Sequence, residues 1–269
     1  MLPTLVGLPT DPLSLVVNYG NPLARSIAFA FVPYRNIFID IVKRDTASSS
    51  GTVSPLVTPL GRSWVMGTTS PATVGGFKTA GSNTYYNTSP NALSIACGAF
   101  NQAAVTNPGN RNVFTYWVDT SSEANGLEIG LQLNGGVMKP YCQITGASSS
   151  NTALAPGASS PPLPPSGGLN ATTPVSFSIA GSYVAGSIRV AAGVPGSATL
   201  TGLTADTKTV SNLAQVFIGD QFANAGTGRA LLWVIGWFRT LSAAELATAV
   251  SGNGGFPPHL LMRRKVNGI

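Results

Sequence analysis

The chain has 269 residues, 43% of them hydrophobic, which is enough to bury the core of one large β sandwich or of two small domains. Only 9% are charged, compared with about 25% in an average soluble protein, and the many Gly (31) and Pro (20) residues are typical of short strands joined by turns. The net charge of +6 comes without a basic stripe of interleaved aromatics, and two cysteines with one histidine form no metal-ligand pattern, so neither a nucleic-acid partner nor any metal or cofactor is expected.

Residues 1–22 contain four prolines and are predicted to form an extended N-terminal arm. An apolar arm has to be covered either by the protein's own sandwich or by a neighbouring subunit, and the sequence leaves both possibilities open. Because no Lys or Arg precedes Arg25 and prolines interrupt the apolar stretch, this segment is not a signal peptide. No run of about 18 apolar residues exists to insert into a membrane. We expect synthesis in a bacterial cytoplasm.

Strand-like segments begin after this arm. Residues 26–32 and 37–42 are short runs of β-branched and aromatic residues, and residues 45–59 are expected to be a loop rich in Ser, Thr, Gly and Pro. Further short strands are predicted around residues 64–66, 92–100 and 113–119. The expected single domain extends over residues 23–256.

The clearest alternation of apolar and polar residues is at residues 127–133, followed by Asn134-Gly135-Gly136 and a second run at 137–144. Asn-Gly between two such runs is a strong signal for a β-hairpin. Pro140 favours an edge position or a bulge in the returning strand.

Residues 146–174 are low in complexity and rich in Pro, Ser and Gly, which predicts a protruding loop. Strands are expected again at residues 175–179, 187–191, 216–218 and 229–239. Ser242 and Glu245 match a capping box, so one helix is predicted from Ala243 to Val250, with Gly252 as its left-handed cap. Residues 257–269 are predicted to be a C-terminal arm.

The end of the predicted domain resembles the laminin-G-like or concanavalin-like jelly-roll family, particularly the versions encoded by tailed bacteriophages. The resemblance is in the apolar run that starts at Leu232, the Arg239-Thr240-Leu241-Ser242 turn, Glu245-Leu246, and the Gly255-Phe256-Pro257-Pro258 tail. Weaker similarity lies at residues 23–26, 36–42 and 217–220. The resemblance implies an all-β sandwich of two antiparallel sheets, with function in loops and concave faces, and it favours assembly as a trimer. It does not imply one activity.

Catalysis is not expected. Glycosidases need two carboxylates on either side of the scissile bond. Glu123 and Glu128 are the nearest acidic pair, and their odd spacing would place them on opposite faces of one strand. Glu128 alone could face the concave surface. No nucleophile elbow accompanies His259, so a serine hydrolase is not expected either.

Two groups of side chains are candidates for other roles. Tyr85 and Tyr86 lie in a polar segment and could contact glycan, whereas Trp233 and Trp237 lie in an apolar run and are predicted to be core residues. Cys97 and Cys142 are interpreted as buried thiols on strands rather than a disulfide. Candidate assembly residues on the two arms are Leu5, Leu8, Leu13, Leu15, Phe256, Leu260, Leu261, Arg263 and Arg264.

The main functional hypothesis is a non-catalytic structural component of a phage virion, such as a capsid decoration, neck or tail accessory protein. Its partners would be other virion proteins, held by the two arms, because a surface so poor in charge is weakly protected against association. The alternative is a lectin-like adhesin that binds polysaccharide on the host surface. A glycan hydrolase is a third and weaker alternative.

Overall fold

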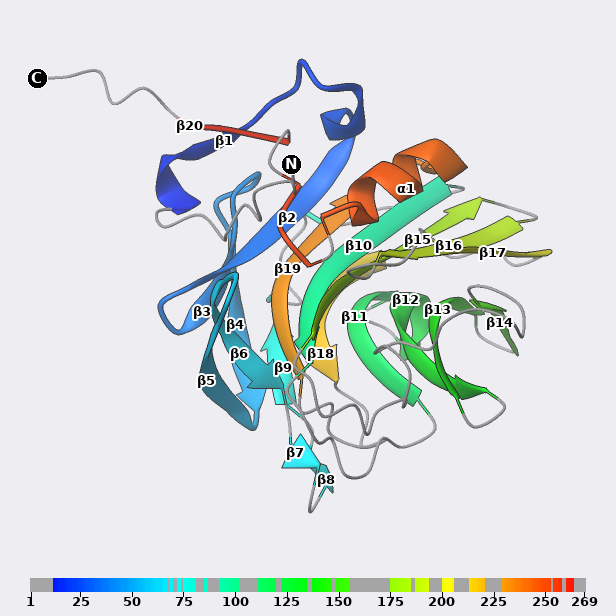
Figure 1. Ribbon diagram of the computed structural model, residues 1–269, viewed down its shortest axis with the longest axis horizontal. Coiled ribbons are helices and arrows are strands. Elements are labelled where there is room, and N and C mark those ends of the chain that lie inside the picture. Colours follow the sequence, from blue (N-terminus) through cyan, green and yellow to red (C-terminus); the bar gives the residue numbers. More distant parts are fainter. Residues whose placement is uncertain are drawn as a thin grey trace, which may run out of the picture.

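The computed structural model describes residues 12–66, 68–69, 72–73, 75–80, 85–86, 92–101, 111–119, 122–134, 137–146, 149–154, 175–184, 187–193, 200–205, 213–220, 229–252, 254–257 and 260–263. Most of them belong to antiparallel strands, which form two curved layers (Figure 1). The predicted all-β, two-sheet jelly-roll architecture with one short helix is confirmed.

Each layer is one antiparallel sheet. Sheet 1 consists, in spatial order, of β3 (Ile37–Asp40), β2 (Ile27–Tyr34), β19 (Arg229–Trp237), β10 (Ala92–Asn101), β15 (Val175–Val184), β16 (Ser187–Gly193) and β17 (Leu200–Ala205), with β6 (Gly61–Met66) pairing β19 and β5 (Val53–Thr58) pairing β6. Sheet 2 consists of β14 (Ser149–Leu154), β13 (Val137–Gly146), β12 (Ser122–Asn134), β11 (Arg111–Asp119), β18 (Leu213–Asp220), β9 (Gly75–Lys78) and β4 (Thr46–Gly51). The two sheets join at one edge, where Phe38 of β3 is opposite Ala47 of β4. A small pair, β7 (Thr68–Thr69) and β8 (Ala72–Thr73), lies apart from both sheets.

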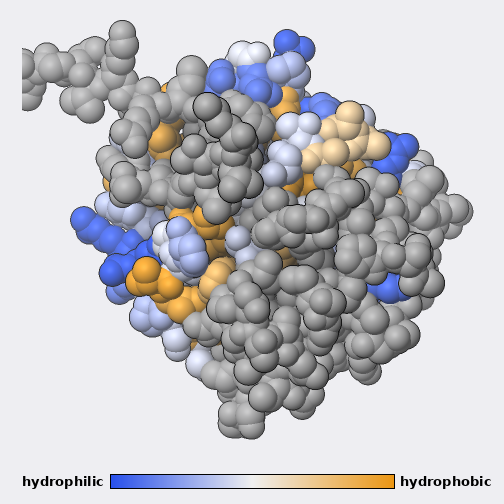
Figure 2. Space-filling view, in the orientation of Figure 1, coloured by the Kyte–Doolittle hydropathy of each residue, from blue (hydrophilic) through white to orange (hydrophobic). Residues whose placement is uncertain are grey.

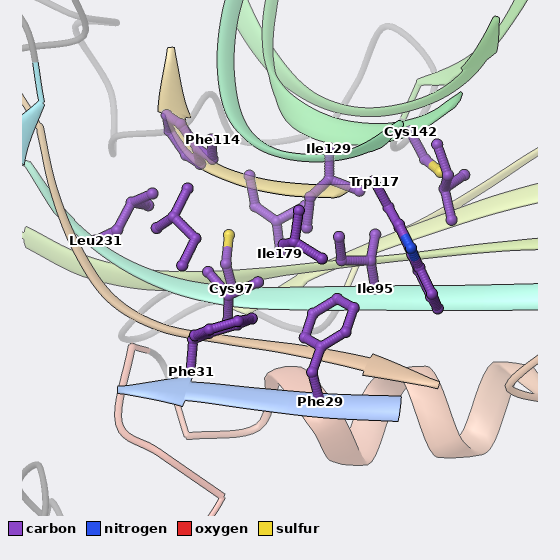
Figure 3. Packing of buried hydrophobic residues seen from close by; sticks show 14 of the residues in the cluster. Phe29, Phe31, Ile95, Cys97, Phe114, Trp117, Ile129, Cys142, Ile179 and Leu231 are labelled. Atoms are coloured by element: carbon purple, nitrogen blue, oxygen red, sulfur yellow. The ribbon is translucent and has the colours of Figure 1, made fainter. Parts of the chain in front are cut away.

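The main core lies between the sheets because apolar side chains alternate along the strands and face inward. Phe29 and Cys97 come from sheet 1, and Phe114, Trp117 and Ile129 come from sheet 2 (Figure 3). All five are at most 1% exposed. Burying one large apolar side chain contributes about 1.5–3 kcal/mol, so this cluster is a main source of stability.

The hairpin predicted around Asn134-Gly135-Gly136 is confirmed, since Asn134 of β12 is opposite Val137 of β13. Pro140 is paired with Leu131 on one side, and the pairing with β14 begins only at Tyr141. Pro140 therefore has a strand partner on one side only, in agreement with the predicted edge position.

Two predicted loops contain strands. The segment 45–59 contains β4 and all of β5. Strand β14 lies within the predicted 146–174 loop, whose residues 155–174 are outside the described part of the chain. Strand β17 was also missed. Strand β4 pairs with the distant β9, a contact that its sequence cannot signal. Strands β5, β14 and β17 pair with a neighbouring strand, but β4 and β14 are rich in Ser and Thr and β5 contains Pro55, so they lack the apolar alternation of a typical strand.

The helix α1 (Ala243–Val250) has the predicted bounds and capping box: Ser242 Oγ accepts from the Glu245 amide, and a Glu245 carboxylate oxygen accepts from the Ser242 amide. Its buried residues cover the outer face of sheet 1, where Trp233 and Trp237 lie in a second apolar cluster. The left-handed position is not at Gly252, as predicted, but at Gly254, whose φ is 96°.

The described parts of the two predicted arms pair with each other. The strand β1 (Leu15–Val17) lies antiparallel to β20 (Leu261–Arg263), and the Asn18 amide donates to the Leu260 carbonyl at 2.8 Å. Short 3₁₀ turns, Pro12–Ser14 and Pro22–Ala24, flank β1. We call the pair of β1 and β20 the terminal ribbon; Figure 1 shows it beyond the helix side of the sandwich.

This pairing corrects the interpretation of several candidate assembly residues. Leu15, Phe256 and Leu260 are at most 6% exposed because the chain itself covers them, so they offer no surface to a neighbouring subunit. Leu13 is 45% exposed and is available. Leu261 and Arg263 belong to β20, but their side chains are not described, and Leu5, Leu8 and Arg264 lie outside the described residues. In the part of the chain that is described, no helix is long and apolar enough to cross a bilayer.

Candidate functional site

The two tyrosines predicted to contact glycan have opposite environments. Tyr85 is 54% exposed, whereas Tyr86 is fully buried. Their rings are perpendicular, with centroids 6.5 Å apart. The prediction that Tyr86 is an exposed contact residue is therefore wrong, and Tyr85 alone of the two can reach a ligand.

Tyr86 is buried because it belongs to the core. Its ring packs against Phe29 and Phe31 of β2, at centroid distances of 5.7 and 5.8 Å. The Tyr86 hydroxyl lies 3.2 Å from a carboxylate oxygen of Asp40 and 3.0 Å from one of Asp45. These contacts fix the backbone that carries Tyr85.

Trp117 connects this segment to a second exposed ring. Its indole N–H donates to the Tyr86 carbonyl at 3.1 Å, and its ring packs edge-on against Phe29 at 5.0 Å. Figure 3 shows Trp117 of sheet 2 directed toward the strand that carries Phe29. On another side, Trp117 contacts Phe238 at a centroid distance of 5.5 Å.

Phe238 is 37% exposed although it directly follows the buried strand β19. Its amide donates to the Ser26 carbonyl at 2.8 Å, which fixes its position. Sequence reasoning missed this residue because it ends a continuous apolar run. The one available signal was the adjacent Arg239, which marks the point where the run leaves the core.

We call Tyr85, Tyr86, Trp117 and Phe238 the aromatic end of the sandwich. Its two exposed rings come from distant parts of the chain. Phe238 packs directly on the fully buried Trp117, and Tyr85 packs against Tyr86, whose carbonyl accepts from the Trp117 indole. Rigid aromatic rings at a surface offer a flat apolar face at little entropic cost, which suits ligands that combine apolar faces with hydroxyl groups.

Asp40 forms the polar base of this site. One of its carboxylate oxygens accepts hydrogen bonds from the Ala30 amide at 2.9 Å and the Val42 amide at 2.8 Å. Asp40 is fully buried, and burial raises the pKa of its carboxyl despite these hydrogen bonds. Among the described residues, no group of three or more His, Cys, Asp or Glu side chains could hold a metal ion.

Glu128 lies on the outer face of sheet 2 in a row of cross-strand partners. The row crosses β9, β18, β11, β12 and β13, with one residue from each strand opposite the next: Lys78, Phe217, Tyr116, Glu128 and Gln143. The Lys78 ammonium lies 5.9 Å from the centre of the Phe217 ring. Glu128 faces away from the core, as it would have to do to act alone as an acid on the concave surface. Its side chain is nevertheless fully buried. The side chain of Glu123 is not described.

No protein-family model matches the chain, and no curated protein is similar to it in sequence. Solved structures do share its fold. One is from botulinum neurotoxin type C, which depends on interaction with two ganglioside molecules to enter cells (TM-score 0.53, 10% identity, 84% of this chain and 50% of that one). Another is the binding domain of Paraclostridial Mosquitocidal Protein 1 (TM-score 0.57, 9% identity, 84% and 52%).

A third similar structure is domain 4 of AbnA, a GH43 extracellular arabinanase from Geobacillus stearothermophilus, in complex with arabinotriose (TM-score 0.53, 12% identity). It matches 82% of this chain, which in turn covers 97% of that domain. The chain spans about half the length of the two toxin structures. At these identities the likeness is one of fold. It supports the jelly-roll resemblance, and these three structures contain nothing specific to bacteriophages.

Proposed function

We propose that this protein is a lectin-like domain that binds glycan, without catalysis, at its aromatic end. The observation that carries the proposal is that two exposed rings are linked to the buried Trp117: Phe238 packs on it directly, and Tyr85 packs against Tyr86, whose carbonyl accepts from the Trp117 indole. Each ring can stack on the apolar face of a sugar, and the fixed backbone around them lowers the entropic cost of binding.

The comparisons support this ligand class. Arabinotriose is present in one structure of the same fold, and gangliosides are named for another. The carbohydrate would be a surface glycan, with bacterial polysaccharide as the first class to test, which is the alternative that the sequence suggested. Absence of catalysis is part of the proposal: among the acids whose side chains are described, Asp40 and Glu128 are both fully buried.

The test is calorimetric titration of the protein with polysaccharides that bind in a glycan-array screen. Replacing Tyr85 or Phe238 by Ala should weaken binding about fivefold to tenfold, the loss expected for one stacked ring. Tyr19→Ala is a matched control, since Tyr19 is 58% exposed and lies outside the aromatic end. Equal affinity of all three variants would refute the site, and sugar release by the wild-type protein would refute the absence of catalysis.

A virion component remains the second candidate, with the adhesin attached to a phage particle made in the bacterial cytoplasm. It rests on a sequence of which only 9% is charged. Figure 2 shows hydrophobic residues at the described surface beside hydrophilic ones, and Leu13 and Val57 are among the exposed apolar side chains. Such a surface favours assembly, and a trimer is proposed. Light scattering on the purified chain tests this: a trimer is expected, and a monomer at all concentrations contradicts it.

A further inference from the structure

The hydroxyl group of Tyr86 has more acceptors than it has protons. It lies 3.0 Å from Asp45 and 3.2 Å from Asp40, and one O–H can donate fully to only one carboxylate. The second carboxylate can form a good hydrogen bond to the same oxygen only if it carries a proton and donates it. With both acids ionised, two negative charges would meet at one hydroxyl in the protein interior, at high cost.

We propose that Asp40 holds a proton in the folded protein and donates it to the Tyr86 oxygen, while the Tyr86 hydroxyl donates to Asp45. We call these three side chains the relay. The relay positions the neighbouring Tyr85 and thereby makes the glycan site sensitive to pH. The sensitivity of glycan binding rests on the proposed function. The shared proton itself does not.

The surroundings favour the protonated form of Asp40. Asp40 is fully buried, and burial raises the pKa of its carboxyl, whereas Asp45 is only partly buried. Burial and the two neighbouring carboxylates also raise the pKa of Tyr86, so the hydroxyl keeps its proton.

Among the described residues, the groups that act on the Asp40 carboxyl are the backbone amides of Ala30, Val42 and Lys43 and the Tyr86 hydroxyl, and none of these is a cation. Phe29 and Phe31 present apolar rings, and the Trp117 indole donates to the Tyr86 carbonyl. The charged neighbours on the same loop are Lys43, whose backbone N–H contacts Asp40, and Arg44. The Arg44 guanidinium donates to the carbonyls of Pro12, Leu13 and Leu15.

The direction of the pH effect follows from the raised pKa of Asp40. The folded state then holds a proton that the unfolded chain releases. The stabilisation is complete below the ordinary carboxyl pKa of 3.8 and is lost as the pH rises through the raised value. The relay therefore predicts a protein that is more stable in mild acid than at neutral or alkaline pH.

Asp40→Asn is the decisive variant, because an amide reproduces the neutral acid: its oxygen accepts from Ala30 and Val42, and its NH₂ donates to Tyr86. The thermal midpoint of the wild type should fall by about 2–4 °C between about pH 5 and pH 8. Because the amide cannot titrate, the thermal midpoint of the variant should fall less than that of the wild type over this pH range. At pH 8 the midpoint of the variant should equal or exceed that of the wild type. A variant with the wild-type pH slope and a lower midpoint throughout would overturn the proposal.

A titration of the wild-type aspartate carboxyl carbons by NMR keeps the proposal testable if the variant does not fold. One aspartate should titrate well above the usual range, and titration of every aspartate near its ordinary pKa would overturn the proposal. Neither measurement involves glycan, so their failure is distinct from failure of the glycan site. For the site, Tyr86→Phe should weaken glycan binding and remove its pH dependence, and unchanged binding and pH profile would contradict the positioning role.

Discussion

The indole N–H of Trp233 donates a hydrogen bond to the carbonyl oxygen of Gly254 at 2.9 Å. The Gly254 amide in turn donates to the Ser178 hydroxyl at 2.7 Å. Two strands of sheet 1 thereby hold the segment that follows α1, and Phe256 packs on Trp233 at a centroid distance of 5.7 Å. The closing motif that resembles jelly-roll domains is thus fixed to the outer face of sheet 1, and we call these contacts of Trp233, Gly254, Ser178 and Phe256 the lock.

This lock requires glycine at position 254. The φ of 96° is unfavourable for any other residue, and a Cβ atom there would lie 2.7 Å from the Cβ of Ser176. Gly254→Ala should therefore lower the free energy of unfolding by about 1–3 kcal/mol, measured by urea denaturation. Gly20→Ala is the control, since an added Cβ meets only the Asn18 side chain at 3.2 Å. Equal stability of the two variants would contradict the account.

The thiols of Cys97 and Cys142 should be inert in the native protein. Both are free, fully buried in the core between the sheets, and burial raises the pKa of each thiol. A thiol reagent should therefore label neither cysteine until denaturant is added, and then both. Mass spectrometry reads this out, and rapid labelling of either cysteine in the folded protein would show that the core is open.

The Arg239–Glu245 ion pair should contribute only a little stability, and only above strongly acidic pH. The pair has an N–O distance of 2.7 Å, and Arg239 lowers the pKa of Glu245 to about 2 from 4.5. The contribution is complete above the ordinary pKa and is lost as the pH falls through about 2. Because both side chains are partly exposed, solvent screening limits it to less than about 1 kcal/mol.

Glu245→Gln tests this pair while preserving the shape of the capping residue. At neutral pH and low salt, the variant should be slightly less stable than the wild type in urea denaturation. The difference should shrink at about 1 M salt and near pH 2. A difference that is independent of both salt and pH would assign the effect to the helix cap instead.

Arg44 should control how firmly the N-terminal segment is held. Its guanidinium donates to three carbonyls, with the shortest distance of 2.7 Å to Leu15, and its own φ is 61°. Arg44→Ala keeps the backbone strain but removes the three donors. Hydrogen exchange of the Asn18 amide, which donates to Leu260, should then accelerate, while amides in β10 should be unaffected. Unchanged exchange at Asn18 would show that the terminal ribbon does not depend on Arg44.

Features determined by neighbouring residues could be predicted from the sequence. The hairpin between β12 and β13 and the cap of α1 depend on side chains a few residues apart, namely Asn134-Gly135-Gly136, Ser242 and Glu245. The alternation of apolar residues likewise predicted the strand at residues 127–133, whereas the two-sheet sandwich was implied by the resemblance to jelly-roll domains. In each case local chemistry and the global fold favour the same structure.

Features that depend on distant partners could not be predicted. Tyr86 is buried because Asp40 and Asp45, far away in the chain, bind its hydroxyl, and nothing in its polar surroundings signals this. Leu15 is buried because β1 meets β20 from the opposite end of the chain. Phe238 joins the candidate site only through Trp117. Long-range contacts of this kind decide which apolar residues remain exposed.

The most direct test of the glycan site is an NMR titration that follows the indole N–H signals of the tryptophans. The Trp117 indole N–H donates a hydrogen bond to the Tyr86 carbonyl, and the Trp117 ring contacts Phe238. A glycan that stacks on the exposed rings should therefore shift the Trp117 indole signal. The Trp233 signal should stay in place, because that indole is bonded to Gly254 on the other face of sheet 1. Glycan binding that leaves the Trp117 signal unmoved, or no binding by any polysaccharide tested, would contradict the account.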